Sequence, residues 1–301
     1  MLIPPKRIVF TGGGLRTLGH FGVLEVLSER GLLHQVKEYI GVSAGALIGF
    51  CMLLGYSFEE MKQVVTEFDF THLQNAHPEL VLDFFSKYGV DSGDQLSKFC
   101  KSLLRIKGHS EDVTFASWAH LQPKAPRLRC YATDLQTGDL KEFSTDASPG
   151  TSLVFALRAS MSLPLYFTPV VDPDTGHMLV DGGLIHNFPF NCLSNEEKES
   201  ALGISFLYSK DVVQEIPDFL GFVTQLYNCG FNPRTYQVQK DNALRCIVIP
   251  TTSMSAYNFD VSKEVREDLI QRGRDAAIEF CDTYLKRLFH HKKPVRRYSV
   301  S

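Results

Sequence analysis

One short segment carries the pattern of a serine nucleophile. Residues 41–45 read Gly-Val-Ser-Ala-Gly, which fits GxSxG with Ser43 at its centre. In this pattern the serine occupies a strained turn between a strand and a helix, and the flanking Gly41 and Gly45 leave room for backbone and substrate. The helix that follows points unpaired N–H groups and its positive dipole end at the serine. Taken alone, the residues also fit an ordinary serine at the start of a tightly packed helix, so the prediction depends on context.

A glycine-rich segment near the N-terminus could supply the second part of such a site. Residues 11–16 read Thr-Gly-Gly-Gly-Leu-Arg and again lie between an expected strand and an expected helix. Successive glycine N–H groups can face an anion with little obstruction from side chains. A dinucleotide-binding loop is the alternative, but it requires Gly or Ala where Thr17 stands and an acidic residue where Ser43 stands. We therefore expect an oxyanion hole formed by the N–H groups of Gly12, Gly13, Gly14 and Ala44.

The proton acceptor that a serine nucleophile needs is expected to be Asp181. This residue follows a short strand and precedes Gly182 and Gly183, a permissive turn in which backbone donors can fix a carboxylate. The site must be partly desolvated, because the ordinary pKa of an aspartate is about 3.9. Nine of the ten histidines lie in no recognisable catalytic context, and His186, the closest to Asp181 in the sequence, is the one to substitute as a test of a histidine-based alternative. An ordinary Asp-Gly turn is the structural alternative, and it is disfavoured because three strand-terminal elements occur in one chain.

Strands and helices must bring these three elements to one edge of a sheet. Apolar and β-branched runs predict strands at residues 7–10, 38–42, 127–135, 140–143, 177–180, 203–208 and 246–249. Helical spacing and capping residues predict helices at residues 18–27, 43–50, 57–68, 95–104, 152–161 and 260–289, while residues 69–92 form an insertion or cap. Strands that alternate with helices favour an α/β fold, a three-layer α/β/α sandwich with a mostly parallel central sheet. We expect a single domain over residues 1–301.

The composition excludes several classes of protein. With 31 basic and 34 acidic residues among 301, the formal charge is −3, so no global positive field exists for nucleic-acid binding. The seven cysteines are widely spaced and include no CxxC pair, which indicates reduced thiols in a cytoplasmic compartment and no metal site. No apolar run reaches the ~18 residues of a membrane span, which leaves attachment to a membrane surface open.

The residues around these elements resemble the patatin-like acyl hydrolases. The resemblance rests on the order of the glycine-rich loop, the GxSxG segment and the Asp-Gly-Gly segment, which continues to Asn187 and Pro189. Residues 156–164, Ala-Leu-Arg-Ala-Ser-Met-Ser-Leu-Pro, are similar to the family's helix before the catalytic aspartate strand, and residues 132–138 add a further match. The similarity covers residues 7–210 well and the remainder weakly. Thr17 departs from the glycine usual at the end of the loop.

The resemblance implies a catalytic dyad without histidine, in which Ser43 is the nucleophile and Asp181 the base. It also implies an oxyanion hole from residues 12–14 with Arg16 beside it, supported by Gly41, Gly45, Gly182 and Gly183. The implied substrate is a lipid ester, and no cofactor or metal is implied. An acyl-Ser43 intermediate would form and then be hydrolysed by water that the same carboxylate activates.

The leading hypothesis is a lipid acyl hydrolase of the phospholipase A or lysophospholipase type. A neutral-lipid lipase or an acyltransferase is the nearest alternative, and a catalytically silent lipid-binding or interaction module is the alternative from another class. We expect a cytoplasmic protein that is peripheral on membranes. The basic C-terminal stretch, residues 286–301, could attach it to anionic lipid, together with Phe84 and Phe85, although a frayed, solvated terminus is the competing interpretation.

Overall fold

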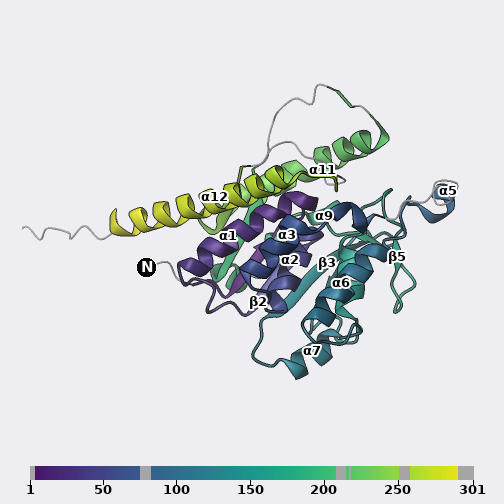
Figure 1. The fold of residues 1–301 in the computed structure, drawn as a ribbon, viewed down its shortest axis with the longest axis horizontal. Helices are drawn as coiled ribbons and strands as arrows, with labels where there is room; N and C mark the ends of the chain where they lie inside the picture. Colours follow the sequence, from purple (N-terminus) through teal and green to yellow (C-terminus); the bar gives the residue numbers. More distant parts are fainter. Residues whose placement is uncertain (1–3, 75–82, 208–214, 217, 251–257, 291–301) are drawn as a thin grey trace, which may run out of the picture.

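The eight strands of the described residues form one mixed sheet, as a computed structural model shows (Figure 1). The structure describes residues 4–74, 83–207, 215–216, 218–250 and 258–290. The hydrogen-bonded strand order is β5-β6-β3-β2-β1-β7-β8, and β4 also pairs with β3. The strands are β1 (Arg7–Phe10), β2 (Glu38–Val42), β3 (Arg127–Asp134), β4 (Leu140–Phe143), β5 (Val170–Val171), β6 (Met178–Asp181), β7 (Ala201–Phe206) and β8 (Cys246–Ile249).

The strands that carry the predicted serine and glycine-rich segments belong to the parallel part of the sheet. Strand β1 lies between β2 and β7, β7 pairs with β8 and β2 pairs with β3, all in parallel. The carboxyl ends of β1 and β2 therefore meet at one edge of the sheet. Strands β4 and β6 run antiparallel to β3, and β5 runs antiparallel to β6. The expected three-layer α/β fold with a mostly parallel sheet is confirmed.

Helices cover both faces of the sheet (Figure 1). The α-helices are α1 (Leu18–Glu29), α2 (Ala44–Leu53), α3 (Phe58–Glu67), α5 (Phe84–Lys87), α6 (Asp94–Ile106), α7 (Phe115–Leu121), α8 (Leu153–Ser160), α9 (Gly183–His186), α10 (Asn195–Glu199), α11 (Phe219–Asp241) and α12 (Lys263–His290). Four short 3₁₀ segments are η1 (Gly14–Thr17), η2 (Phe70–Leu73), η3 (Pro189–Cys192) and η4 (Ala243–Arg245).

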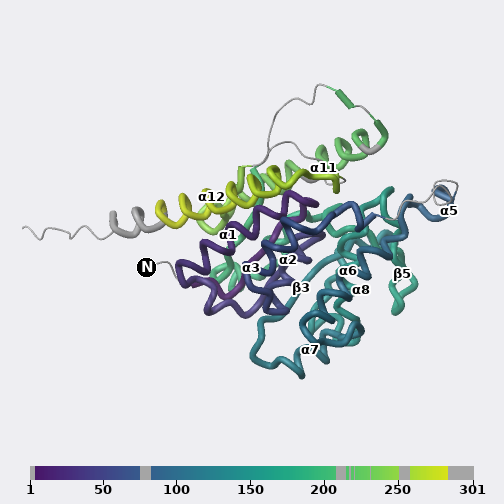
Figure 2. The backbone as a smooth tube through the Cα atoms, in the orientation of Figure 1, coloured from purple at the N-terminus to yellow at the C-terminus, as the bar shows by residue number. Residues whose placement is uncertain are grey.

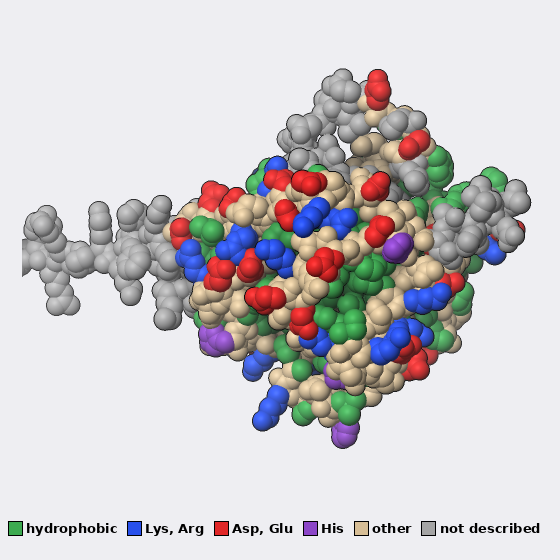
Figure 3. Space-filling model, in the orientation of Figure 1, with side chains coloured by type: hydrophobic (Ala, Val, Ile, Leu, Met, Phe, Trp, Pro, Cys, Tyr) green, Lys and Arg blue, Asp and Glu red, His purple; other side chains and the backbone are tan. Residues whose placement is uncertain are grey.

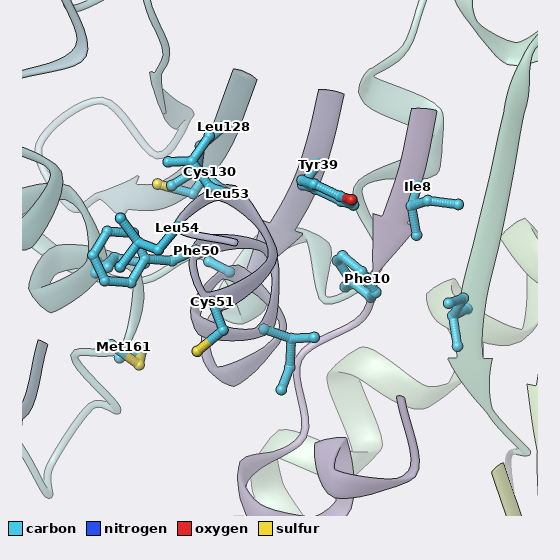
Figure 4. Close-up of a cluster of buried hydrophobic side chains, with 14 of the residues drawn as sticks. Ile8, Phe10, Tyr39, Phe50, Cys51, Leu53, Leu54, Leu128, Cys130 and Met161 are labelled. Carbon is cyan, nitrogen blue, oxygen red and sulfur yellow. The ribbon is translucent and has the colours of Figure 1, made fainter. Parts of the chain in front are cut away.

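Side-chain alternation along the strands builds a core on each face. Ile8 and Phe10 of β1 face a large cluster that includes residues of α1, α2, α6 and α8. Figure 4 shows part of it, with side chains of β1, β2 and β3 around those of α2. Val9, between them in the sequence, faces a smaller cluster that includes Phe188 and Phe190 on the opposite side. The continuous apolar run of β1 is therefore that of a strand buried on both faces of the sheet.

Most elements follow the sequence expectations within a few residues. Ser57 and Glu60 form the expected capping box of α3. Helices α7, α9, α10 and α11 and strand β5 were not predicted. Within the predicted insertion at residues 69–92, η2 and α5 are described, whereas residues 75–82 lie outside the described part of the chain. The basic C-terminal stretch lies outside it from residue 291 onward, so its predicted role in membrane attachment stays a prediction.

The last helix is held against the first by a close backbone approach. Helix α12 lies along α1, although the two helices stand at opposite ends of the chain (Figures 1 and 2). A Cβ atom at Gly273 would lie 1.9 Å from the carbonyl oxygen of Gly19, and one at Gly22 would lie 2.0 Å from that of Ile270. Because the clashing atoms are backbone, only glycine allows this helix contact without a shift of the helices.

Gly273→Ala is therefore expected to lower the free energy of unfolding by roughly 1 to 3 kcal/mol, the usual penalty for overpacking. Denaturant unfolding followed by circular dichroism measures this change. Gly230→Ala is the matched control, because Gly230 is also inside a helix but has no atom within 4 Å of the added methyl position. The control should gain about 1 kcal/mol from helix propensity. Equal stability of the two variants would contradict the close-approach argument.

Candidate active site

Ser43 lies in the strained turn that its sequence context predicts. It stands between the end of β2 and the start of α2, with φ 56° and ψ −136°. A side chain at this positive φ is unfavourable by about 1 to 3 kcal/mol, so surrounding contacts must hold it. A Cβ atom at Gly41 would lie 2.6 Å from the backbone nitrogen of Ala46, and one at Gly45 would lie 2.4 Å from the carbonyl oxygen of Thr11. Glycine at both positions is therefore what allows the turn to form against its neighbours.

A buried hydrogen bond fixes the backbone of Ser43. Its N–H donates to Oγ of Ser160, at 2.9 Å, and its carbonyl oxygen accepts from the N–H of Ala46, also at 2.9 Å. Ser160 is the last residue of α8 and is fully buried. Two residues later, the carbonyl oxygen of Ser162 accepts from the N–H of Asp181. The end of α8 therefore holds the backbones of both predicted dyad residues. In the sequence, Ser160 stood out only as part of a family-like segment.

Asp181 is brought to Ser43 by strand β3. Val42, the last residue of β2, pairs with Tyr131 of β3, and Asp181, the last residue of β6, pairs with Ala132, the next residue of β3. Strand β4 pairs with residues 130–133 of β3, which overlap both of these pairings. Both β2 and β6 must then lie on the other edge of β3, where they run toward each other end to end. This antiparallel pairing places the residue after β2 beside the end of β6.

The Asp181 carboxylate is buried and only half hydrogen-bonded. Asp181 is 3% exposed, and its Oδ1 accepts a hydrogen bond from the N–H of Gly183 at 2.7 Å. No described residue donates a hydrogen bond to Oδ2. Burial raises the pKa of Asp181 to about 7, while the nearby Ser43 hydroxyl and the Gly183 N–H act in the opposite direction. The Ser43 hydroxyl thus lies close to the carboxylate without completing a hydrogen bond, a common state of catalytic pairs in unliganded sites.

The glycine-rich loop offers backbone donors next to Ser43. The N–H of Gly12 already donates to the carbonyl oxygen of Asn187, at 3.0 Å. The N–H groups of Gly13, Gly14 and Ala44 donate to no acceptor among the described residues. Gly14 has φ 56°, a conformation that favours glycine and begins η1. The loop therefore presents two free donors, and the start of α2 presents a third.

Two cavities meet at Ser43. The first is lined almost entirely by apolar side chains from α1, α2, α3, η2 and α6, among them Leu18, Leu47, Val65, Phe70 and Leu103. The second contains the polar residues, with Arg16, Asp181, Asn187, Thr224, Tyr227 and Asn228 in its wall. Gly14, Ser43 and Leu163 line both. The serine therefore stands between a space suited to a hydrocarbon chain and a space suited to a polar group.

Arg16 is a half-buried cation without an ionic partner in the described part of the chain. Its Nε donates to the carbonyl oxygen of Gly13 at 3.2 Å, and its guanidinium lies 5.8 Å from the centre of the Phe206 ring. No carboxylate of a described residue comes within ion-pair distance of it. Burial lowers the pKa of Arg16, which remains a cation at neutral pH. An anion in the polar cavity would supply the missing counter-charge.

No histidine of the described residues lines either cavity. His20 is fully buried between the rings of Phe10 and Phe206, with neither ring nitrogen hydrogen-bonded. Burial lowers the pKa of His20 to about 3, so this ring is neutral at physiological pH. Within the same described residues, no cluster of three or more His, Cys, Asp or Glu side chains could hold a metal ion.

Three residues of the polar cavity, Thr224, Tyr227 and Asn228, come from the unpredicted helix α11. The sequence does contain a signal for them, because residues 219–233 include no charged residue although the helix lies at the surface. No element is predicted there from the sequence alone.

The raised pKa of Asp181 predicts how the Asp181→Asn variant behaves. The pKa in the folded state, about 7, exceeds the unfolded value, so ionisation of Asp181 destabilises the parent protein as the pH rises through 7. The neutral amide avoids this loss. The variant should therefore be more stable than the parent by roughly 2 to 4 kcal/mol above pH 7, and the difference should vanish below about pH 4. Urea unfolding across this pH range measures it.

Asp172→Asn is the matched control, and its expected change in the free energy of unfolding has the opposite sign. Asp172 is also buried, but Lys141 donates to it at 3.0 Å. Burial raises its pKa, and the hydrogen bonds from Lys141 and its neighbours outweigh burial and leave the pKa lowered. This variant should be less stable than the parent at neutral pH. An Asp181→Asn variant that is less stable than the parent at every pH would contradict the buried, uncompensated carboxylate.

Comparisons with known proteins identify the family of this chain. Residues 8–193 match the sequence profile of the family described as patatin-like phospholipase. The chain is 26% identical to the uncharacterized protein YqhO of Bacillus subtilis, over 88% of this chain and 94% of that protein. It is 24% identical to a probable lipid hydrolase of Invertebrate iridescent virus 6, over 86% of this chain and 83% of that protein. It is also 32% identical to human patatin-like phospholipase domain-containing protein 6, over 60% of this chain and 12% of that protein.

Solved structures show the same fold. VipD from Legionella pneumophila superposes with a TM-score of 0.63 and 17% identity, over 93% of this chain and 67% of that one. Human GIVD cytosolic phospholipase A2 superposes with a TM-score of 0.51 and 14% identity, over 96% of this chain and 60% of that one. No helix among the described residues is both long and apolar enough to span a membrane. By its sequence and by its sheet of mostly parallel strands flanked by helices, the chain belongs to the patatin-like phospholipase family.

Proposed function

We propose that this protein is a lipid acyl hydrolase of the phospholipase A or lysophospholipase type. The observation that carries the proposal is the placement of Ser43. It stands at the junction of an apolar cavity and a polar cavity, beside a buried carboxylate with a free oxygen. The apolar cavity suits an acyl chain, and the polar cavity suits the group esterified to it. The ester carbonyl between them would lie at the Ser43 hydroxyl.

The reaction would proceed through an acyl-serine. Oδ2 of Asp181 accepts the proton of the Ser43 hydroxyl while Oγ attacks the ester carbonyl carbon. The resulting oxyanion accepts hydrogen bonds from the N–H groups of Gly13, Gly14 and Ala44, which have no other acceptor among described residues. The carbonyl re-forms, the ester bond breaks, and the leaving alcohol takes the proton from Asp181. Water then gives a proton to Asp181 and attacks the acyl-serine, and Oγ leaves with that proton.

The pKa of Asp181 supports its role as base. A base must be ionised before the reaction and must still hold a proton during it, which is most effective when its pKa lies near the working pH. Burial brings the pKa of this carboxyl to about 7. A histidine is then unnecessary, in accord with the lack of any histidine in the walls of the two cavities within the described residues.

Ser43 should be the residue that reacts with an alkyl fluorophosphonate. The parent protein is expected to take up one label, the Ser43→Ala variant none, and the Asp181→Asn variant to react at least about 100-fold more slowly. The parent's labelling rate should rise with pH through about 7 and level off above it, because only the ionised carboxylate accepts the proton. Mass spectrometry of intact protein and of peptides measures the label.

Ser148→Ala is the matched control for this experiment. Ser148 is as buried as Ser43 but donates to the carbonyl oxygen of Glu142, in a part of the structure that lines neither cavity. It should label like the parent. Labelling of the Ser43→Ala variant, or an unchanged rate for Asp181→Asn, would contradict the proposed dyad. A parent that binds lipid but never labels would favour the silent lipid-binding alternative.

Arg16 favours a phosphate-bearing lipid over a neutral one. Its guanidinium stands in the wall of the polar cavity and has no carboxylate partner among the described residues. A phosphate diester or monoester oxygen is the acceptor that a guanidinium binds most strongly in this setting. The neutral-lipid alternative provides no such anion.

Arg16→Gln is expected to lower kcat/KM for a lysophospholipid by about 10- to 100-fold, the usual effect of losing a charged hydrogen bond. A monoacylglycerol with the same acyl chain should lose far less, because it has no phosphate. Arg16→Lys keeps the charge and should restore part of the activity on the lysophospholipid. Equal losses on both substrates would place Arg16 in support of the glycine loop and would overturn the head-group assignment.

A further inference from the structure

Exposed apolar side chains lie next to residues that line the polar cavity and on α5, which packs on the start of α11. We define these six residues as the apolar rim: Phe85, Tyr88, Leu165, Phe219, Phe222 and Leu226. Their exposed fractions run from 36% for Leu165 to 88% for Phe85. Single exposed apolar residues are ordinary, but a group of this kind beside one cavity marks a contact surface.

The rim is continuous with the cavity wall. On α11, Phe222 and Leu226 are exposed, whereas Thr224, Tyr227 and Asn228 of the same turns line the polar cavity. Across the opening, Leu165 is exposed and its chain neighbours Leu163 and Pro164 line that cavity. Along α11 the inner surface of the mouth is therefore polar and the outer surface apolar, whereas the Leu165 segment is apolar on both.

Ring contacts join α5 to this surface. The rings of Phe84 and Phe219 meet edge to face with centres 6.3 Å apart, and Phe85 packs on Phe84 at 5.5 Å. Tyr88 lies beside the Leu165 segment, because the N–H of Val90 donates to the carbonyl oxygen of Tyr166. Helix α5 projects from the body of the molecule at the right of Figure 1, whereas α12 extends to the left. The most exposed ring of the rim is thus carried on its most protruding element.

The charge of this region is nearly neutral. Residues 219–233 of α11 contain no charged side chain. Lys87 of α5 pairs with Asp83 at 2.9 Å, and Asp218 caps the start of α11 by accepting from the N–H of Gly221. Elsewhere, acidic and basic side chains intermingle over α1 and α12 on the face drawn in Figure 3. The rim therefore lacks the lysines and arginines that attract a protein to anionic lipid by charge alone.

We propose that the apolar rim is the surface by which this protein enters a lipid interface, with Phe85, Phe219, Phe222 and Leu226 inserted among the lipid chains. The inference rests on the proposed function, because it explains how a lipid ester reaches a buried serine without crossing water. Protruding, separate aromatic side chains suit a fluid interface, whereas a second protein would need a surface shaped to fit them. A second copy of the chain placed here would also close the mouth of the cavity.

The second half of α11 keeps this surface attached to the sheet. Nε2 of Gln239 donates to Oγ of Ser205 at 2.6 Å and to the carbonyl oxygen of Phe206 at 2.7 Å, and both contacts are buried. Pro233 separates this anchored half from the exposed half. The first half carries the exposed side chains of the rim and also packs on the core through the buried Val223.

The test compares three rim variants with one control variant. The rim variants are Phe222→Ser, Phe85→Ser and the double variant that combines these two substitutions, and the control is Leu244→Ser. Leu244 is the control because it is 62% exposed but precedes β8, so it lies at the end of the parallel strands opposite to Ser43. Binding to phosphatidylcholine vesicles is measured by co-sedimentation at low and high salt. Each single rim variant should bind about tenfold more weakly, the usual value of burying part of an aromatic side chain, at both salt concentrations. Leu244→Ser should bind like the parent.

Turnover of a soluble short-chain ester provides the second measurement. It should be equal in the parent and in the rim variants, whereas turnover of vesicle lipid should fall with binding. A parent that binds vesicles through the rim but hydrolyses no ester would overturn the proposed function and leave the interface assignment intact. The assignment itself is overturned if the rim variants bind like the parent, if Leu244→Ser loses as much, or if binding is lost at high salt. A parent dimer that Phe222→Ser dissociates, without vesicle binding, would assign the rim to a second copy and equally overturn it.

Discussion

Strand β3 is the element on which the candidate site depends. It pairs with β2 through Tyr131 and with β6 through Ala132, so consecutive residues of one strand hold the ends of two others. The two strands run toward each other, which is why Ser43 and Asp181 meet although 137 residues separate them in the chain. Because Asp181 ends β6, which runs antiparallel to β3, its carboxylate lies at the end of β2 without a long loop to position it. Its geometry is as rigid as the sheet.

This arrangement places two energetically unfavourable features side by side, the backbone conformation of Ser43 and the burial of the Asp181 carboxyl. Surrounding contacts offset their cost in free energy. Ser43 holds a backbone conformation that favours glycine, and Asp181 is a buried carboxyl with a pKa near 7 and one unpaired oxygen. The buried hydrogen bond from the Ser43 N–H to Ser160 and the backbone bond between Asp181 and Ser162 stabilise both residues from the same side. A folded protein keeps such strain where it serves a reactive group. In the proposed mechanism, the same features that destabilise the site activate the serine without histidine.

The division of space around Ser43 connects the site to the proposed lipid interface. Apolar walls lie on one side of the serine, and a cation without a carboxylate partner in the described part of the chain lies on the other. Helix α11 belongs to both the wall and the outer surface, because Thr224, Tyr227 and Asn228 line the cavity while Phe222 and Leu226 are exposed. One helix without charged residues in its first half thus lines the polar cavity and forms part of its rim.

The local elements of the site could be read from the sequence because each depends on neighbours in the chain. The GxSxG turn at Ser43, the glycine-rich loop and the Asp-Gly-Gly turn each require a particular backbone shape that only certain residues adopt, and their strands and the capping box of α3 follow the same local rules. The sequence also identified the family, whose profile covers residues 8–193.

Other features of the site arise only from contacts between segments that are distant in the sequence. They include the pairing of β6 with β3, the acceptor that Ser160 offers to Ser43, the use of the Gly12 N–H by Asn187 and the burial that raises the pKa of Asp181. Helix α11 was missed for the same reason, since its two surfaces are defined by a cavity wall and an exposed rim and not by the usual division between core and water. Local patterns fix which residues can form a turn, but tertiary packing decides which buried groups face each other and which remain without a partner.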